Sequence, residues 1–251
     1  MFKSTTSSPL ISFDEKIQDA LLPSTIYSWI KTRKFSRKGE KELELVPFLA
    51  RSDKAAIDIG ANKGVWTHRL LQTCPEVYAF EPNPKMYRRL EKCFGKRARV
   101  SPIAISNETG SSVLRIPKTS GGYSSQLSTL SSVQEFDDHL PVDVITSKLD
   151  DQKIDNVGFI KIDVEGFELQ VLEGAKETIE RDKPVLVIEI EEAHTKKDIS
   201  SSIALVEALG YDTFVIADGV FQPLQNAHAG KQKSHSGEYL FNFIFIPKSN
   251  S

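Results

Sequence analysis

The sequence has few of the residues that would tie its fold to disulfides or to a metal. Of its 251 residues only two are cysteine, and the spacing of Cys74 and Cys93 matches no metal-binding pattern. We therefore expect free thiols in a reducing compartment. Apolar runs are short: none approaches the ~20 residues of a membrane-spanning helix, and the opening MFKSTTSSPL lacks the apolar core of a secretory signal. The sequence thus predicts a cytoplasmic protein without a transmembrane segment.

An excess of charge of one sign is also missing. The 34 acidic residues nearly balance the 32 Lys and Arg, and a net charge of −2 gives no general attraction to nucleic acid. One stretch departs from this balance, because residues 31–41, KTRKFSRKGEK, carry six Lys or Arg and one Glu. Two interpretations stay open. The stretch is a solvated surface, or it attracts an anionic substrate or makes peripheral contact with a membrane surface.

Hydrophobic patterning divides the chain near residue 52. We interpret residues 1–52 as a helical lead-in and residues 53–251 as one α/β domain. In the domain, short apolar runs typical of buried strands alternate with helical patterns, which predicts a doubly wound, mostly parallel sheet. The expected strands are 55–59, 77–80, 99–106, 158–162, 184–190, 212–218 and 238–247. The main expected helices are 64–73, 81–94, 166–182 and 198–210.

One segment breaks this alternation. Residues near 108–146 contain TSGGYSSQLSTLSS and are rich in Ser and Gly. A surface insertion without fixed structure is one interpretation. The other, which we favour, is a lid or substrate loop over the carboxyl edge of the sheet, because long loops in compact domains are usually functional.

The first expected strand runs into a turn that contains glycine, from Asp58 through Gly60 and Asn62 to Gly64. Glycine lets the backbone turn sharply and approach a ligand. The next strand ends at Glu81, whose carboxylate can accept hydrogen bonds from both hydroxyls of a ribose. The fingerprint G-x-G-x-x-G is missing because Asn62 stands where a glycine would admit a pyrophosphate, which argues against NAD or FAD. S-adenosylmethionine, with ribose and adenine but no phosphate, suits this turn; a plain turn-forming role for Asp58 is the alternative.

Further cofactor contacts are expected at the ends of the neighbouring strands. Pro82 follows Glu81 directly. Ala104, Ile105 and Ser106 end the third expected strand, in a turn that lies against the adenine in this architecture. Backbone amides and small side chains suffice to hold an adenine there.

The stretch FIKIDVEGFELQVLEGA, residues 159–175, begins as a buried strand and then turns acidic. By strand count it is the fourth strand and lies next to the first, so its carboxyl end faces the crevice where doubly wound sheets bind ligands. We expect Asp163 and Glu165 there, with Asp163 also beside the cofactor. The alternative for Glu165 is a carboxylate that only stabilises the start of the next helix. Lys161 lies within the strand and needs an acidic partner if it is buried.

Four motifs together resemble the FkbM family of S-adenosylmethionine-dependent methyltransferases. They are IDIGANKG, FEPNP, LDD at residues 149–151 and, most specifically, KIDVEGFELQVLEGA. The resemblance spans about residues 55–191. It implies the class I methyltransferase fold, a Rossmann-like sheet of seven strands whose last strand is antiparallel. It also implies O-methylation of hydroxyl groups on sugars or on polyketide-type products.

Methyl transfer to an alcohol requires groups that orient the acceptor and help to remove its proton. We expect Asp163 and Glu165 to do this, with Lys161 paired to one of them. His194, after the fifth expected strand, is a further candidate base, and its alternative is an ordinary surface residue. Carboxylates of Glu189 and Glu191 could instead converge on a cation such as Mg²⁺. We favour a site without a metal.

Two other functions compete with an O-methyltransferase acting on a glycan or small natural product. One is a non-catalytic domain that binds S-adenosylmethionine or uses the fold to bind a partner. The other is a nucleic-acid methyltransferase. The near-neutral charge argues against it, as does the missing Asn/Asp-Pro-Pro-aromatic tetrapeptide of exocyclic amine methylation.

Overall fold

The structure, a computed structural model, describes residues 40–119, 122–124, 128–131, 138–195, 198–227 and 232–249. No helix in these ranges is long and apolar enough to cross a membrane. The basic stretch expected at residues 31–41 lies outside the described residues, apart from Glu40 and Lys41.

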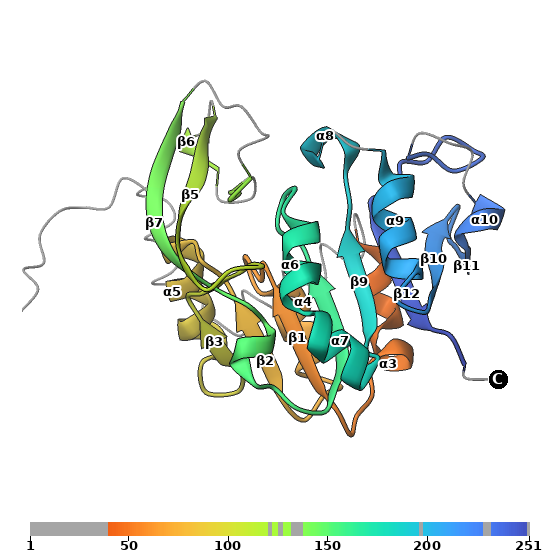
Figure 1. Ribbon diagram of the computed structural model, residues 1–251, viewed down its shortest axis with the longest axis horizontal. Helices are drawn as coiled ribbons and strands as arrows, with labels where there is room; N and C mark the ends of the chain where they lie inside the picture. Colours follow the sequence, from red (N-terminus) through yellow and green to blue (C-terminus); the bar gives the residue numbers. More distant parts are fainter. Residues whose placement is uncertain are drawn as a thin grey trace, which may run out of the picture.

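A sheet of eight strands forms the centre of the molecule, in the order β11-β10-β12-β9-β8-β1-β2-β3 (Figure 1). β1 pairs in parallel with β2 on one side and with β8 on the other, and β9 continues in parallel from β8. β12 is antiparallel to both of its neighbours, β9 and β10. The predicted mostly parallel sheet with an antiparallel last strand is therefore confirmed. Its strands are β1 (Ala55–Ile59), β2 (Val77–Phe80), β3 (Arg99–Ser101), β8 (Val157–Ile162), β9 (Val185–Glu189), β10 (Tyr211–Ala217), β11 (Val220–Pro223) and β12 (Asn242–Pro247).

The strand count differs from the expected seven because the chain turns back after β10. Ala217 pairs with Val220 across Asp218 and Gly219, both of which have positive φ. Two such residues in succession form the tight turn that joins antiparallel strands. β11 thus adds an eighth strand at the edge of the sheet.

The third expected strand, 99–106, is divided between two sheets. β3 pairs with β2, whereas β4 (Ala104–Ile105) pairs with β7 in a second sheet of order β4-β7-β5-β6. Pro102 lies at the break and has no N–H with which to continue the ladder. The other strands of this sheet come from the segment expected as an insertion, and they extend past the carboxyl ends of the central strands (Figure 1). They are β5 (Gly110–Thr119), β6 (Gly122–Tyr123) and β7 (His139–Ser147).

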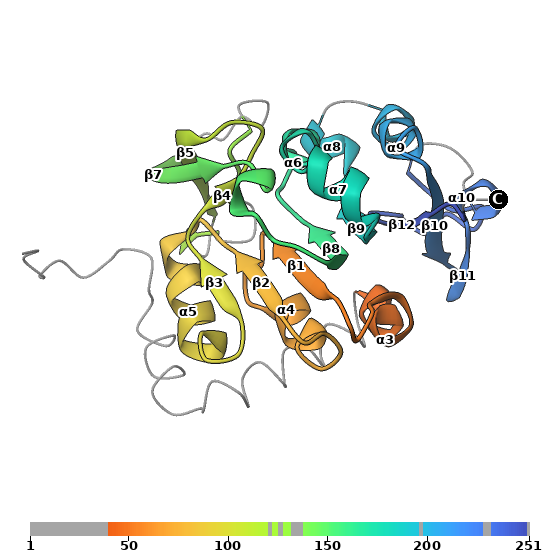
Figure 2. The same ribbon diagram turned by 60° about the horizontal axis from the view of Figure 1, so that its bottom comes forward.

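Helices cover both faces of the large sheet (Figure 2). α6, α7, α8 and α9 lie on one side, and α3, α4 and α5 lie on the other. The helices are η1 (Lys41–Leu45), α3 (Val46–Leu49), α4 (Val65–Leu70), α5 (Pro84–Phe94), η2 (Asp150–Gln152), α6 (Glu168–Gly174), α7 (Lys176–Asp182), α8 (Glu192–Thr195), α9 (Ile199–Glu207) and α10 (Leu224–Ala227).

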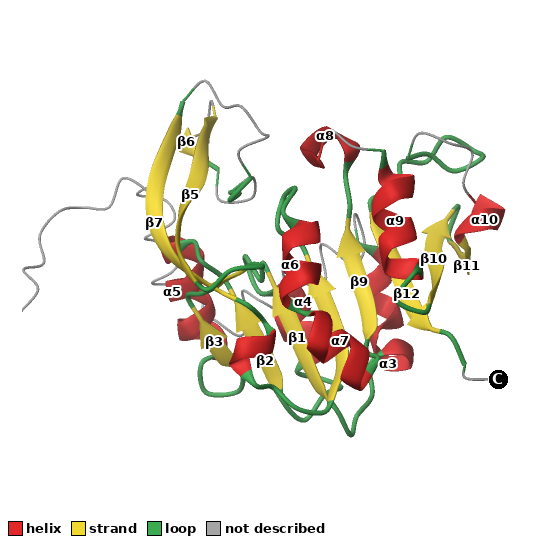
Figure 3. Ribbon diagram, in the orientation of Figure 1, coloured by secondary structure: helices red, strands yellow, loops and turns green. Residues whose placement is uncertain are grey.

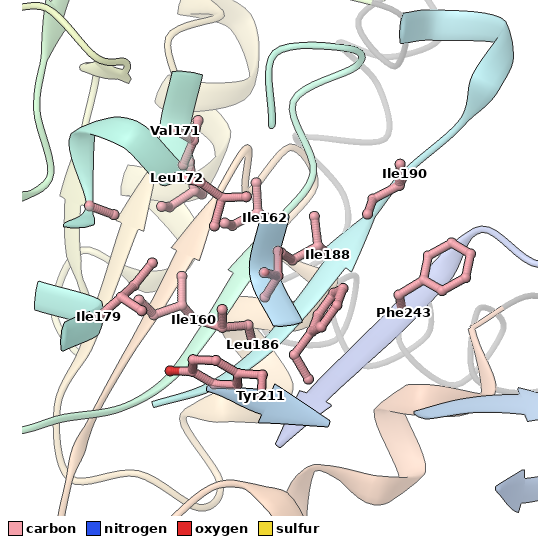
Figure 4. Packing of buried hydrophobic residues seen from close by; sticks show 14 of the residues in the cluster. Ile160, Ile162, Val171, Leu172, Ile179, Leu186, Ile188, Ile190, Tyr211 and Phe243 are labelled. Atoms are coloured by element: carbon pink, nitrogen blue, oxygen red, sulfur yellow. The ribbon is translucent and has the colours of Figure 1, made fainter. Parts of the chain in front are cut away.

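The central strand β8 contributes to a core on each face. Successive side chains of a strand point to opposite faces, so Ile160 and Ile162 join one buried cluster and Phe159 joins the other. Val171 of α6 and Ile179 of α7 pack against the first cluster (Figure 4). Burial on both faces explains why this strand is an almost unbroken apolar run.

The expected helix 166–182 consists of two helices, α6 and α7. Ala175 lies between them with φ −112° and ψ 8°, outside the helical range. The preceding residue, Gly174, approaches another part of the chain: a Cβ on it would lie 1.9 Å from the carbonyl oxygen of Ser106. Only glycine lets α6 pack this closely against the end of β4.

η1 and α3 pack on the domain at the second face of the sheet. Leu43 and Val46 belong to the same buried cluster as Trp66 and Leu70 of α4. The division at residue 52 between a lead-in and a domain stays a prediction.

Candidate functional site

A cavity of about 290 Å³ lies at the carboxyl ends of β1, β2 and β8. The loops that follow the central strands lie along this edge of the sheet (Figure 3). Gly60, Glu81 and Asp163, which come directly after the three strands, all line the cavity. A smaller cavity of about 80 Å³ adjoins it, and both are lined by Glu40, Gly60, Asn62 and Asp163. This is the edge of the sheet at which doubly wound folds bind their ligands.

The turn after β1 brings the backbones of two strands together. Gly60 has φ +79°, and a Cβ on it would lie 1.8 Å from the carbonyl oxygen of Asp163. Asn62 also has positive φ and lines the cavity. Gly64, with φ +76°, begins α4 and faces Leu90 and Phe94 of α5, so its requirement for glycine comes from packing.

Asp58 lies below this turn and lines the smaller cavity. Its Oδ2 accepts a hydrogen bond of 2.5 Å from the Thr67 hydroxyl. Burial raises the pKa of Asp58 to about 7, against the hydrogen bond from Thr67 and the nearby charge of Lys161, which both lower it. Asp58 therefore joins the end of β1 to Thr67 of α4, and its charge also acts on Glu81.

Glu81 presents a carboxylate to the larger cavity. Its Oε2 accepts a hydrogen bond from the Asn62 backbone N–H at 2.7 Å, and its Oε1 accepts one from the Asn83 N–H at 2.8 Å. Burial raises its pKa to about 7, while these two bonds lower it. Each oxygen has a further lone pair with which to accept a hydrogen bond from a ligand. The next residue, Pro82, lines the cavity as well.

The residues expected against an adenine divide into two groups. Ala104 and Ile105 line the larger cavity and form an apolar wall together with Phe80. Ser106 lies elsewhere: its N–H donates to the Ser147 carbonyl at 2.9 Å and its hydroxyl donates to Oδ1 of Asn107 at 3.3 Å. Ala104 and Ile105 of the same segment line the cavity, so it is these local hydrogen bonds that occupy the polar groups of Ser106.

Glu165 lines the cavity from the loop after β8. Its φ is +54°, a conformation that is uncommon for residues with a Cβ, and its carbonyl accepts a hydrogen bond of 2.7 Å from the Thr129 hydroxyl. The adjacent Gly166 has φ +92°, and its N–H donates to Oε1 of Glu168 at 2.8 Å. The carboxylate that bonds to this turn is therefore that of Glu168, and stabilisation of the helix start stays the alternative for Glu165.

His194 reaches the site through Glu165. Its Nδ1 lies 3.0 Å from Oε2 of Glu165, and its Nε2 lies 4.0 Å from Oε2 of Glu191. The hydrogen bond to Glu165 raises the pKa of His194, although partial burial opposes this. Burial raises the pKa of Glu165, and the same hydrogen bond lowers it. Each of the two groups therefore shifts the pKa of the other.

Lys161 is fully buried beside the smaller cavity. Its Nζ donates to Oδ1 of Asn242 at 2.9 Å and lies 5.4 Å from the centre of the Trp66 ring. Burial lowers its pKa, but the neighbouring carboxylates, first Asp163 and then Glu189, raise it by more. Lys161 therefore stays charged and acts as the cation among these acids.

The sequence did not indicate several lining residues. Glu40 comes from the stretch interpreted as a basic surface, and Leu114, Ser128 and Leu130 come from the Ser-rich segment, whose sequence has no pattern that would place them here. Glu189, which the sequence indicates as a possible cation ligand, also lines the cavity. Burial and the charge of Asp163 raise its pKa to about 9. Within the described part of the chain, no three His, Cys, Asp or Glu side chains are grouped so that they could hold a metal ion.

Comparison with known proteins gives a family. The family model described as the methyltransferase FkbM domain matches residues 58–213 of this chain. The 2-O-methyltransferase NoeI of Sinorhizobium fredii (strain NBRC 101917 / NGR234) is 29% identical over 154 residues, which are 54% of this chain and 63% of NoeI. The match therefore spans less than two thirds of that relative.

Solved methyltransferase structures resemble the chain more distantly. Methyltransferase FkbM from Methylobacillus flagellatus KT is 20% identical with a TM-score of 0.47, covering 78% of this chain and 44% of that one. The TehB-like SAM-dependent methyltransferase from Corynebacterium glutamicum is 13% identical with a TM-score of 0.43, covering 90% and 98%. The fold itself, with its mostly parallel sheet and antiparallel β12, is that of class I methyltransferases.

Proposed function

Because the chain belongs to the FkbM methyltransferase family, we propose that it is an S-adenosylmethionine-dependent O-methyltransferase. Its acceptor is a hydroxyl group of a glycan or of a small natural product. One observation carries the proposal. The same cavity is lined by Glu81, which suits a ribose, and by Asp163 and Glu165, which suit an acceptor hydroxyl. Gly60 lies between these two groups, because β1 lies between β2 and β8. The name of NoeI, a 2-O-methyltransferase, supports transfer to oxygen.

The residues of the cavity fit this methyl donor. Glu81 offers carboxylate oxygens to the two hydroxyls of a ribose. Ala104 and Ile105 form a small apolar surface against which an adenine can pack. Gly60 and the turn after it leave backbone N–H and C=O groups accessible to the remaining part of the donor. When bound, the donor supplies a methyl group on a positively charged sulfur.

The chain's own residues must orient the acceptor and receive its proton. An alcohol is a weak nucleophile at neutral pH, and a carboxylate within hydrogen-bond reach assists by accepting the proton as the oxygen attacks. Asp163 and Glu165 follow β8 and line the cavity, which supports this role for them. His194, 3.0 Å from Glu165, holds that carboxylate and acts as a positioning residue.

The Ser-rich segment supplies part of the cavity wall. Leu114 of β5 lines the cavity together with Ser128 and Leu130. These residues lie above the carboxyl edge of the sheet, where an acceptor would approach. We propose that this segment contributes to acceptor selection.

A non-catalytic donor-binding domain is the alternative, and a methylation assay separates it from the enzyme. The full chain is incubated with S-adenosylmethionine labelled on its methyl group and with a fractionated extract of the source cells. Transfer of label to a hydroxyl-bearing fraction by the wild-type chain, and none by Asp163→Asn, supports the enzyme. Binding of the donor without transfer to any fraction supports the alternative.

We propose that the reaction needs no divalent cation. The same assay after exhaustive dialysis against a chelator tests this. Undiminished transfer is expected, since Glu189 and Asp163 have Lys161 as a cationic neighbour. Loss of transfer that returns with added Mg²⁺ would instead favour a metal held by the carboxylates after β8 and β9.

A further inference from the structure

Glu40 lies ahead of the region that matches the family, yet it lines both cavities of the site. Its carboxylate accepts a hydrogen bond from Nε1 of Trp66, in the first turn of α4. Burial is the largest influence on the pKa of Glu40 and raises it; the nearby charge of Lys161 lowers it, and that of Asp163 raises it. Glu40 is therefore a partly buried carboxylate beside a charged lysine and an accessible cavity.

The residues that follow Glu40 fix its place on the domain. Arg69 Nε donates to the carbonyl of Leu43 at 2.9 Å, and Lys41 forms an ion pair of 3.0 Å with Glu238. The side chain of Glu42 accepts a hydrogen bond of 3.4 Å from Nδ2 of Asn242. η1 is thus held at three points, and its start is set by contacts with distant parts of the chain.

The two cavities have different lining residues and share a few of them. Glu81 lines only the larger cavity, whereas Trp66 and Lys161 line only the smaller one. Glu40 and Asp163 line both. If Glu81 holds the ribose of a nucleoside and the wall of β4 holds its base, as the proposed function requires, the region that the two cavities share is left for the remaining substituent. In the proposed donor that substituent is an amino acid, with an ammonium group and a carboxylate.

We propose that Glu40 binds the ammonium group of the donor's amino-acid part. A carboxylate partly withdrawn from water forms a strong, charge-assisted hydrogen bond with an ammonium group. The cation of Lys161, which also lines the smaller cavity, favours the carboxylate of the same amino acid. The segment ahead of the family's domain thereby takes part in donor recognition. This inference rests on the proposed function.

A purely structural role would make Glu40 a counter-ion of Lys161, and its loss would then affect every ligand of the site alike. Two ligands separate these roles. S-adenosylhomocysteine carries the amino-acid part with its ammonium group. 5′-Methylthioadenosine has the same adenine, ribose and thioether but no amino acid. Isothermal titration calorimetry with the full chain measures the affinity of each.

Glu40→Gln should weaken the binding of S-adenosylhomocysteine by about tenfold to a hundredfold, the usual worth of a hydrogen bond to a charged group. Its affinity for 5′-methylthioadenosine should stay within about twofold, because that ligand has no ammonium group to lose. Glu40→Asp keeps the charge and should lose less than Glu40→Gln. Glu44→Gln, an exposed neighbour in η1, is the matched control and should change neither affinity.

Two results would overturn the inference. One is no change in either affinity for Glu40→Gln, and the other is an equal loss of both, which would make the residue structural. Failure of the proposed function looks different, since the wild-type chain would then bind neither ligand.

Discussion

Gly60 and Asp163 meet backbone to backbone, so that a Cβ on Gly60 would lie 1.8 Å from the Asp163 carbonyl oxygen. The N–H of Asp163 donates to the carbonyl of Ile59 at 3.0 Å, which continues the pairing of β1 with β8 into the site. The turn proposed to bind the donor and the acid proposed to face the acceptor are therefore held against each other. This contact gives the site its fixed geometry.

Gly60→Ala should disrupt both the fold and the site. The new methyl group meets a backbone atom, which cannot rotate away, and the φ of +79° is itself unfavourable for alanine. We expect a loss of at least about 2 kcal/mol in the free energy of unfolding, measured by urea denaturation, and weaker binding of S-adenosylhomocysteine.

Gly110→Ala is the control for this substitution. A Cβ on Gly110 has its nearest neighbour, Oγ1 of Thr146, at 4.0 Å. Its unfolding should stay close to that of the wild type. An equally stable Gly60→Ala variant would contradict the close contact between β1 and β8.

Asp163→Asn should abolish methyl transfer while leaving the affinity for S-adenosylhomocysteine within a few-fold. The amide keeps the shape of the side chain but cannot accept the acceptor's proton as a carboxylate does. Transfer of a labelled methyl group to the responsive extract fraction measures turnover, and calorimetry measures affinity. Asp143→Asn, at an exposed position of β7, should keep full turnover. Persistent activity of Asp163→Asn would remove this residue from the chemistry.

The pair of His194 and Glu165 should make part of the stability depend on pH. Because the pKa of His194 in the folded chain is raised above 6.5, its protonated form stabilises the fold below that value. This contribution is lost as the pH rises through the folded-state pKa. Urea denaturation should therefore give a difference between the wild type and His194→Gln that is largest near pH 6 and declines toward pH 9.

His68 provides a control with the opposite sign. Partial burial is the main cause that lowers its pKa below 6.5, and the charges of Arg97 and Arg69 add to it. Protonation of His68 therefore opposes folding, and the advantage of the wild type over His68→Gln should grow as the pH rises. If His194→Gln behaved in the same way as His68→Gln, the bond between His194 and Glu165 would not be present in solution.

Lys161→Met should destabilise the protein strongly. Lys161 is fully buried, and it is the cation that offsets Asp163, Glu189 and Glu42. Removing one partner of such a cluster leaves buried carboxylates uncompensated, which costs about 3–5 kcal/mol. Lys148→Met, at an exposed position, should change the free energy of unfolding by less than about 0.5 kcal/mol. Equal stability of the two variants in urea would show that Lys161 is not needed as a counter-charge.

The sequence predicts the centre of the fold and the polar ends of its strands well. β1, β2 and β8 are local apolar runs, and each ends in the turn or acid that lines the cavity, with Gly60, Glu81 and Asp163 where the pattern places them. Such signals lie within a few residues of one another. The parallel pairing of β1 and β8 then follows from the order of strands in a doubly wound sheet.

The features of the site that the sequence does not predict depend on contacts between distant residues. Glu40 enters the site because η1 packs on α4, and nothing in a stretch of lysines and arginines indicates that packing. Ser106 is expected in the wall of the site beside Ala104 and Ile105, but its N–H pairs with Ser147 and its hydroxyl bonds to Asn107. Similarly, the sequence contains both Glu165 and His194 as candidates without indicating that they bond to each other.

The most direct test of the account is whether Glu81 binds the donor's ribose. Isothermal titration calorimetry with the full chain should detect binding of S-adenosylhomocysteine. Glu81→Ala should weaken it by more than about tenfold, because two hydrogen bonds to a charged group are lost. NADH should not compete. Tight binding of NADH with none of S-adenosylhomocysteine, or a Glu81→Ala variant with unchanged affinity, would contradict the account.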